Sequence, residues 1–292
     1  MGICDNRTII ITGAGGGLGR AYALGFAAEG AKVVVNDIRQ EAAAKVCEEI
    51  EANGGEALAN SDDITSVAGA SKILEAALGR FNEVHGVVNN AGVCRDKMFA
   101  TMTEEDWDQV MQVHLRGHFC LANVLTRYWR ERSKAGEPVN ARIINTSSGA
   151  GLQGSIGQSN YSAAKAGILG LTLVQAAELA RYGITANAIA PQARTSMTEG
   201  VFDEMMKAPE DGGFDSWDPA NVAPLVVWLG SSASSHVSGQ VFEAKGGWIS
   251  VADGWRTGPE KDKQERWQPA ELTEVVDGLL AEAKPAQKVY GT

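Results

Sequence analysis

The stretch RTIIITGAGGGLGR, residues 7–20, joins a run of β-branched residues to a glycine-rich turn and the start of a helix. Gly13, Gly17 and Gly19 stand where a strand would turn sharply into that helix. Glycine lets the backbone approach a pyrophosphate closely, and it lets the amides of the helix N-terminus point at the phosphates. The spacing is G-x-x-x-G-x-G rather than the commoner G-x-G-x-x-G, and tight packing alone can also require glycine. The stretch predicts a nucleotide-binding turn that the rest of the chain has to support.

Outward from this turn, short β-branched runs alternate with longer helical stretches. The expected strands cover residues 7–12, 32–36, 56–60, 85–90, 141–147, 184–190 and 240–245. The expected helices cover residues 17–29, 40–53, 65–79, 104–133, 160–182 and 218–230. Because the strands are apolar on both faces, this alternation predicts an α/β fold with a doubly wound parallel sheet. The sheet is expected to be Rossmann-like, with about seven strands and with helices on both sides.

Two segments interrupt the alternation. Residues 192–216 are expected to form a lid or to pack at a subunit interface, because apolar side chains recur there at helical spacing. Those side chains are Met197, Val201, Phe202, Met205 and Met206. We therefore expect one catalytic domain, 1–253, and a C-terminal extension, 254–292. The extension contains an amphipathic helix near 269–283 and either covers the substrate site, embraces a neighbouring subunit or is loosely ordered.

Composition excludes several classes of protein. The 292 residues carry a net charge of −10, so no overall field attracts nucleic acid or an anionic membrane. The cysteines, at positions 4, 47, 94 and 120, form no C-x-x-C pair, which argues against a zinc site and a disulfide framework. We recognise no signal sequence and no stretch with the roughly 18 apolar residues of a membrane span. We expect a cytoplasmic chain without metal, nucleic-acid or membrane partners.

A carboxylate follows the second expected strand. Asp37 lies eighteen residues beyond Gly19, where an acidic side chain accepts hydrogen bonds from an adenosine ribose. The same charge would repel a 2′-phosphate, so NAD is favoured over NADP as cofactor. Arg20 and Arg39 are the alternative, since each is either a phosphate ligand or a solvated charge.

Further candidate cofactor-site residues follow the first, third and fourth expected strands. Leu18 lies within the glycine turn, Asp63 and Ile64 follow the third strand, and Asn90 ends the fourth. Ligands of open α/β sheets bind at the carboxyl ends of the strands, so we expect all four residues to line the cofactor site. Each is also compatible with an ordinary turn.

The fifth expected strand runs into Ser148, thirteen residues before Tyr161, and Lys165 follows one helical turn later. Tyr161 and Lys165 lean to the same face of a helix with about 3.6 residues per turn. A phenol has a pKa of about 10, and each unit of lowering requires about 1.4 kcal/mol. A neighbouring ammonium and the positive nicotinamide ring supply such stabilisation, although a half-buried tyrosine beside a solvated lysine would show the same spacing.

Taken together, T-G-x-x-x-G-x-G, N-N-A-G and S-x12-Y-x-x-x-K, in this order, resemble the short-chain dehydrogenase/reductase family over roughly residues 7–250. The resemblance implies an NAD(H)-dependent oxidoreductase that interconverts a secondary alcohol and a ketone. It assigns Tyr161 as acid/base, Lys165 as its activator and as a ligand of the nicotinamide ribose, and Ser148 as the anchor of the substrate oxygen. It also implies a homodimer or homotetramer formed through the helices at 104–133 and 160–182.

Two positions depart from the family pattern. His114 stands where the family usually has an asparagine that completes a proton relay to the lysine, so it is either a catalytic relay group or a packed helix residue. Gln192 replaces the usual glycine after Pro191. The residue of the following segment that meets the cofactor, among Thr195, Ser196 and Thr198, is therefore open.

Three motifs narrow the resemblance within the family. VHLRG at 113–117, APLVVWL at 223–229 and GGWI at 246–249 look most similar to the (3R)-hydroxyacyl-CoA dehydrogenase part of peroxisomal multifunctional enzyme type 2 and to related bacterial enzymes. A lipid-like small-molecule substrate, a 3-hydroxyacyl-CoA or a steroid, is implied. The alternatives are a catalytically silent NAD-binding regulator of the same fold and a lyase or epimerase that uses the cofactor transiently.

Overall fold

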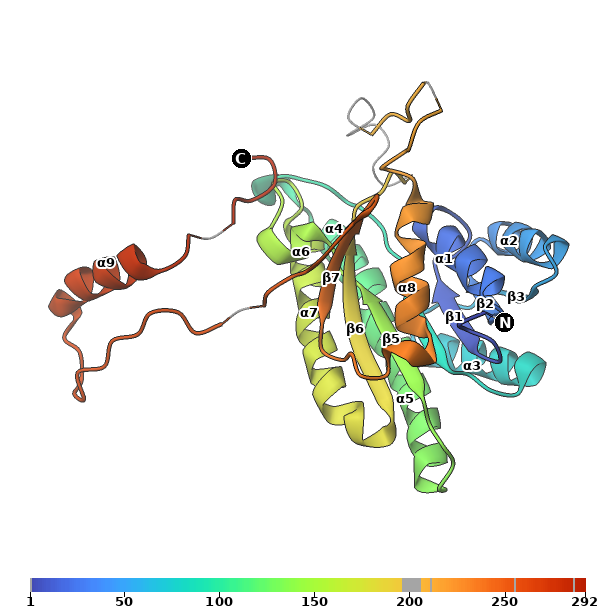
Figure 1. The fold of residues 1–292 in the computed structure, drawn as a ribbon. Coiled ribbons are helices and arrows are strands. Elements are labelled where there is room, and N and C mark those ends of the chain that lie inside the picture. The colour runs from blue at the N-terminus through green and yellow to red at the C-terminus, as the bar shows by residue number, and fades with distance from the viewer. Residues whose placement is uncertain (1, 196–205, 211, 255, 286) are drawn as a thin grey trace.

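The centre of the molecule is one twisted sheet (Figure 1). The computed structural model describes residues 2–195, 206–210, 212–254, 256–285 and 287–292. Its strands are β1 (Thr8–Thr12), β2 (Lys32–Asn36), β3 (Glu56–Asn60), β4 (Gly86–Asn89), β5 (Ala141–Thr146), β6 (Ile184–Pro191), β7 (Val241–Lys245) and β8 (Trp248–Val251). They are ordered β3-β2-β1-β4-β5-β6-β7-β8, all neighbours being parallel except the antiparallel pair β7 and β8. The predicted doubly wound parallel sheet is confirmed.

β8 is a strand that the sequence did not predict. It pairs with β7 from Lys245 opposite Trp248 onward, so Gly246 and Gly247 form a two-residue hairpin turn. Glycine pairs are favoured in such turns because they accept positive φ angles, and Gly246 has φ +52°. The expected parallel crossover pattern contains no hairpin, which is why this strand was missed.

Helices flank the sheet on both sides, and the last helix lies apart from it. They are α1 (Gly17–Ala28), α2 (Gln40–Ala52), α3 (Val67–Phe81), α4 (Glu104–Met111), α5 (Gly117–Lys134), α6 (Gly149–Gln153), α7 (Ser159–Leu179), α8 (Ala223–Gly230) and α9 (Leu272–Glu282). The single helix expected over 104–133 is divided by a π-helical turn, Gln112–Arg116. The short helix α6 was not predicted, because its five residues, GAGLQ, carry no helical periodicity.

The isoleucines of β1 show how the sheet separates two cores. Ile9 and Ile11 pack with side chains of α1, α2 and α8, whereas Ile10 packs with α3 and α5. All three are at most 1% exposed. Because successive side chains of a strand point to opposite faces, a central strand covered on both faces is apolar throughout. The prediction of helices on both sides is confirmed.

The strand order reverses beside β1. The chain runs from β1 outward to β2 and β3, and then crosses to β4 on the other side of β1. Ligands of open α/β sheets bind at such a switch point, beyond the carboxyl ends of the strands. The fold therefore places the glycine turn after β1 and the N-N-A-G segment after β4 on the two sides of one crevice.

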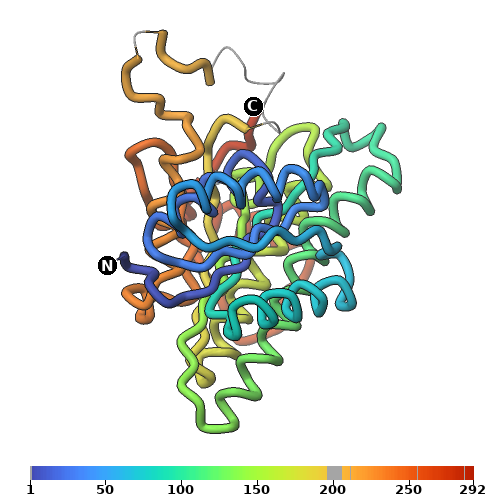
Figure 2. Tube along the Cα trace, turned by 90° about the vertical axis from the view of Figure 1, so that its right-hand side faces the viewer, coloured from blue at the N-terminus to red at the C-terminus, as the bar shows by residue number. Residues whose placement is uncertain are grey.

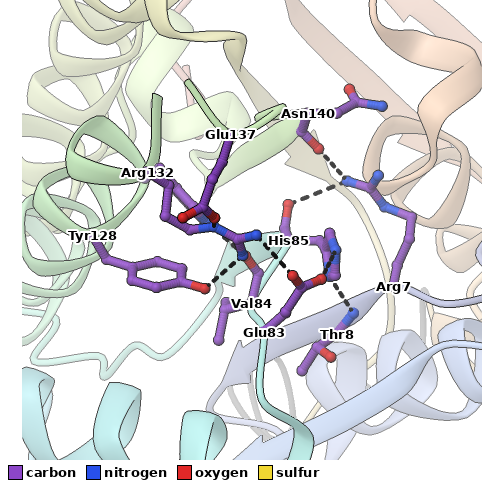
Figure 3. A network of polar contacts seen from close by, with 10 residues as sticks. Arg7, Thr8, Glu83, Val84, His85, Tyr128, Arg132, Glu137 and Asn140 are labelled. Carbon is purple, nitrogen blue, oxygen red and sulfur yellow. Dashed lines mark hydrogen bonds and ion pairs between the residues drawn. The ribbon is translucent and has the colours of Figure 1, made fainter. Parts of the chain in front are cut away.

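A polar network closes the opposite, amino-terminal end of the sheet (Figure 3). The Arg7 guanidinium donates to the carbonyls of His85 at 3.2 Å and of Asn140 at 3.0 Å, which lie just before β4 and β5. Glu83 accepts from Arg132 at the end of α5 at 2.7 Å and lies 3.2 Å from the His85 ring. The network ties strand starts to a helix end, far from the crevice, so we regard it as structural.

Among the described residues, one helical run is long and apolar enough, by length and composition, to cross a membrane: Ser159–Tyr182. The expectation that no such stretch exists therefore needs correction. The run packs against β6 and α6, and its buried face carries Asn160, Lys165 and Gln175, all hydrogen-bonded inside the domain. Its buried face packs inside the domain, whereas Leu173 and Val174 on the same helix are exposed.

The expected C-terminal extension forms an arm in Figure 1. The chain leaves β8, runs to α9 well away from the sheet, and returns to the side of α6. None of the described residues beyond 253 is buried, and α9 exposes Leu272, Val276 and Leu280. The predicted amphipathic helix is confirmed, although it begins with a single 3₁₀ turn, Pro269–Glu271.

The predicted lid is only partly described. Residues 196–205, with Met197, Val201, Phe202 and Met205, lie outside the described residues. In the described remainder, Met206 is buried, whereas residues 207–210 and 212–214 are exposed and project from the domain in Figure 2. The lid stays a prediction.

Candidate active site

The glycine turn after β1 leaves no room for side chains. Gly13 has φ +62°, and a β-carbon there would lie 2.8 Å from the Cα of Ala91. At Gly19 a β-carbon would lie 2.2 Å from the carbonyl oxygen of Gly13 and 2.7 Å from Nδ2 of Asn90. Both glycines are therefore needed for close packing of α1 against the two strand ends.

The N-terminus of α1 is open to an anion. Its N-cap, Gly16, provides no side-chain cap, and the first turn contains no acidic residue. The amides of this turn and the positive end of the helix dipole therefore stay available to a phosphate group. Gly17 has φ +51°, and a β-carbon there would lie 3.5 Å from the side chain of Thr195. Leu18, the next residue, packs against the hydrophobic core. The turn fits the pyrophosphate of a dinucleotide, held by backbone groups.

Asp37 lies where the ribose expectation requires it. Its side chain is nearly buried, and its Oδ2 accepts from the amide of Gly15 at 3.0 Å. Oδ1 accepts from the amide of Arg39 at 3.0 Å and from the Arg39 guanidinium at 3.1 Å. Arg20 is paired with Glu49. Arg20 and Arg39, the two alternative ligands of a 2′-phosphate, are thus both paired with carboxylates. They line a cavity of about 680 Å³.

The polar residues after β3 and β4 have different surroundings. Asp63 is exposed and accepts from the amide of Thr65 at 2.8 Å, and Ile64 is buried in the core. Asn90 donates from Nδ2 to the carbonyl of Thr12 at 3.0 Å, and its amide donates to the Thr12 hydroxyl at 2.9 Å. Asn90 therefore ties the end of β4 to the glycine turn, which it shapes.

Ser148, Tyr161 and Lys165 come together beside this crevice. Ser148 caps α6, with its Oγ accepting from the amide of Ala150 at 3.2 Å, and its side chain hydrogen-bonds that of Tyr161. The Nζ of Lys165 lies 5.5 Å from the centre of the Tyr161 ring. The β5–α6 turn and α7 thus place the three predicted side chains in one cluster.

Burial dominates the electrostatics of the cluster. Desolvation raises the pKa of the Tyr161 phenol, although the hydrogen bond with Ser148 lowers it. Burial lowers the pKa of Lys165 to about 7. The Lys165 ammonium donates to the carbonyl of Thr146 at 2.6 Å. Burial therefore favours the neutral phenol of Tyr161 and disfavours the ammonium form of Lys165.

His114 packs against the catalytic tyrosine. It lies in the π-helical turn, is 1% exposed, and its ring meets the Tyr161 ring edge-on with centroids 5.1 Å apart. Its Nε2 lies 3.0 Å from the amide and 2.8 Å from the carbonyl of Val93. Burial and the Lys165 charge lower the pKa of His114 to about 3. This histidine is neutral at every pH at which the protein would work.

Two features of the site were not predicted. Cys94, in the segment after β4, lies near Tyr161 and Lys165, and burial raises the pKa of its thiol to about 11. Its place shortly after N-N-A-G was the available signal. Tyr290, at the far end of the chain, lies against Gly149, and nothing in the local sequence indicates that contact.

The segment after β6 is described only at its start. The amide of Gln192 donates to the carbonyl of Ala244 at 2.9 Å, so the departure from the usual glycine is accommodated in the β6–β7 pairing. Thr195 lies over the glycine turn, whereas Ser196 and Thr198 lie outside the described residues. Across the described parts of the chain, no group of three or more histidine, cysteine and carboxylate side chains is arranged to hold a metal.

Comparisons with known proteins identify the family of the chain. The family model for short chain dehydrogenases matches residues 7–206. Hydroxyacyl-CoA dehydrogenase ChsB1 of Mycobacterium tuberculosis is 42% identical over 300 residues, covering 99% of this chain and 93% of that protein. Peroxisomal multifunctional enzyme type 2 of Mus musculus is 44% identical over 254 residues, covering 84% of this chain but only 32% of the larger enzyme.

Solved structures show the same architecture. A short chain dehydrogenase from Mycobacterium avium is 53% identical, with a TM-score of 0.92 and complete coverage of both chains. A 3-ketoacyl-(acyl-carrier-protein) reductase from Brucella melitensis, complexed with NADH, is 28% identical with a TM-score of 0.73, covering 83% of this chain and 98% of that one. A nicotinamide cofactor fits the glycine cradle described above. The chain belongs to the short-chain dehydrogenase family.

Proposed function

We propose that the protein is an NAD(H)-dependent oxidoreductase that interconverts the secondary alcohol and the ketone of a 3-hydroxyacyl thioester. The observation that carries the proposal is the cluster of Ser148, Tyr161 and Lys165 beside an open helix N-terminus at the switch point of the sheet. A protein that only sensed the nucleotide would not need the three side chains together.

Each of the three clustered side chains has its own role in the proposed reaction. The side chains of Ser148 and Tyr161 hydrogen-bond to each other, so both hydroxyl groups can bind the oxygen of one substrate alcohol. Tyr161 takes the proton of that alcohol, and Lys165 would hold the ribose of the cofactor. An oxidised nicotinamide bound there would supply the hydride acceptor, and its positive charge would favour the phenolate. General acid–base catalysis of this kind contributes about 10²–10⁴-fold to a rate.

We assign His114 an orienting role. Its pKa of about 3 leaves it unable to hold a proton at neutral pH, and the Val93 backbone engages one of its ring nitrogens. The His114 ring packs edge-on against the Tyr161 ring. The backbone at Gly92 lies close on another side of the His114 ring, since a β-carbon at Gly92 would lie 2.3 Å from the His114 Cε1. The site therefore uses histidine as a rigid, neutral spacer in place of the asparagine usual in the family.

An apolar rim supports the choice of a fatty acyl substrate. Met98, Phe99 and Ile156, which we call the apolar rim, are 60%, 79% and 48% exposed. The amide of Lys97 donates to the carbonyl of Gly157 at 2.8 Å, which brings the two rim segments together in front of α7. Exposed apolar side chains grouped at a site suit an apolar ligand. The names of the relatives, hydroxyacyl-CoA dehydrogenase and 3-ketoacyl reductase, point to the same substrate class.

The exposed side of α5 and α7 supports a homodimer or homotetramer. Phe119 on α5 is 48% exposed, and Leu173 and Val174 on α7 are 55% and 52% exposed. Apolar side chains grouped on neighbouring helices mark surfaces that other chains cover. We propose this face as the contact between copies of the chain.

The first prediction concerns catalysis. With NAD and a panel of 3-hydroxyacyl-CoA thioesters, hydroxysteroids and simple secondary alcohols, the purified chain should reduce the cofactor fastest with a thioester. Tyr161→Phe should lower kcat by at least about 10²-fold, because it removes the group that accepts the proton, while NAD affinity stays nearly unchanged.

Tyr182→Phe is the matched control, because Tyr182 lies at the distal end of the α7 run. It should retain wild-type turnover. Absence of turnover with every alcohol, although NAD binds, would refute the proposed function. Full activity of Tyr161→Phe would refute the role of that residue. Turnover of the alcohols without net accumulation of NADH would favour the lyase or epimerase reading.

The second prediction concerns stability. The pKa of Lys165 falls from 10.5 to about 7 on folding, so the folded chain binds fewer protons than the unfolded chain between these values. The cost of burying the charge is therefore absent above about pH 10.5, grows as the pH falls, and is complete below about pH 7. Lys165→Met removes this cost, so it should stabilise the cofactor-free chain at pH 7.

Denaturant unfolding of both chains between pH 7 and pH 10 measures the effect. The advantage of Lys165→Met should shrink as the pH rises, by up to about 1.4 kcal/mol per pH unit. Comparison with wild type cancels the titration of other groups. An advantage that stays constant over this range would show that Lys165 is an ordinary charged lysine.

The third prediction concerns the cofactor. Asp37→Ala removes the charge that would repel a 2′-phosphate, so it should lower the ratio of kcat/KM for NAD over NADP by about tenfold or more. Arg39→Ala is the matched control, because it removes the ion-pair partner and leaves the carboxylate. That variant should keep the NAD preference. If the ratio of kcat/KM for NAD over NADP is unchanged in Asp37→Ala, a residue other than Asp37 distinguishes the two cofactors.

A further inference from the structure

The last residues of the chain return to the domain and pair with the segment after α6. The amide of Ile156 donates to the carbonyl of Tyr290 at 3.0 Å, and the amide of Tyr290 donates to the carbonyl of Gly154 at 3.2 Å. Ser155 and Tyr290 form the parallel bridge that these bonds define. A β-carbon at Gly154 would lie 3.6 Å from the side chain of Val289. The end of the chain is therefore a short added strand on the site segment.

The Tyr290 side chain contacts Gly149, the residue that follows the proposed substrate anchor, Ser148. Gly149 follows Ser148 directly, and a β-carbon at Gly149 would lie 2.5 Å from the Tyr290 hydroxyl and 2.8 Å from its Cε2. The side chains of Gln153 and Tyr290 hydrogen-bond, and partial burial raises the pKa of the Tyr290 phenol. The side chain is still 41% exposed. Its ring is held against α6 while part of its surface stays open.

The returning segment continues the apolar rim. Val289 is 39% exposed and lies beside Tyr290. A β-carbon at Gly291 would lie 3.4 Å from the side chain of Ile156, which belongs to the rim. Apolar side chains from three distant parts of the chain, near residues 98, 156 and 290, therefore gather around one side of the site.

We propose that Tyr290 is a specificity-determining residue, and that residues 287–292 close the side of the substrate site next to Ser148. The Tyr290 ring contacts the substrate chain beyond the reacting carbon. This inference rests on the proposed function. The segment that forms this side of the site lies outside the family match, which ends at residue 206.

Tyr290 can be substituted without destabilising the domain, because the C-terminal arm contributes no buried side chain to either core in the described residues. No described residue beyond 253 is buried, so changes in the last residues open no cavity in either core. Tyr290→Ala and deletion of residues 287–292 should therefore unfold at the wild-type temperature. A kinetic effect can then be attributed to the site.

The experiment compares kcat and KM of the full chain across 3-hydroxyacyl-CoA thioesters of increasing chain length. Tyr290→Ala should lower kcat/KM for long chains roughly tenfold, mainly through KM, and change the shortest substrate by less than about twofold. Tyr290→Phe keeps the ring and should stay within about threefold of wild type. Leu280→Ala, which trims an exposed side chain of α9 in the same arm, is the matched control and should match wild type.

Hydrogen exchange provides a readout without turnover. Deletion of 287–292 should speed exchange of the Ile156 amide, which loses its acceptor on Tyr290. Unchanged exchange, or the same chain-length profile in Tyr290→Ala as in wild type, would overturn the inference while leaving the proposed function standing. Failure of the wild-type chain to oxidise any thioester would overturn both.

Discussion

The site depends on one constraint: a phenol and an amine, Tyr161 and Lys165, are buried together on one face of α7. Burial disfavours charge on both, so the phenol stays protonated and the pKa of the amine falls to about 7. Burial disfavours a charged lysine in this position, and within the described parts of the chain the carbonyl of Thr146 accepts from it. A positive ring bound beside these two side chains would favour the phenolate of Tyr161.

The rest of the fold holds these groups at the switch point of the sheet. Asn90 ties β4 to the glycine turn, and a chain of buried amides runs from Asn89 through Asn145 to Thr172 and Gln175 on α7. Hydrogen bonds inside a low-dielectric core are strong, and their loss would leave polar groups unpaired. The nucleotide side and the catalytic side of the crevice are thereby connected through the core, without contribution from the C-terminal arm.

Sequence reasoning succeeds where the pattern is local. Seven of the eight described strands, most helices and the glycine turn were predicted from hydrophobic periodicity and local spacing. The Ser148, Tyr161 and Lys165 cluster was predicted because its fixed spacing resembles that of the family. Sequence reasoning fails where distant segments meet. Tyr290 returns to Gly149 over more than a hundred residues, and the short helix α6 and strand β8 depend on packing and on a two-glycine turn. It also predicted an acidified phenol, whereas burial raises the pKa of Tyr161 in the cofactor-free chain.

The most direct test of this account is the ionisation of Tyr161 itself. Ultraviolet difference titration of wild type against Tyr161→Phe isolates the tyrosinate signal of that residue, first without cofactor and then with saturating oxidised NAD. The account predicts a pKa above that of free tyrosine in the cofactor-free chain and a marked downward shift when the oxidised cofactor binds. An ordinary pKa that is the same in both states would contradict it.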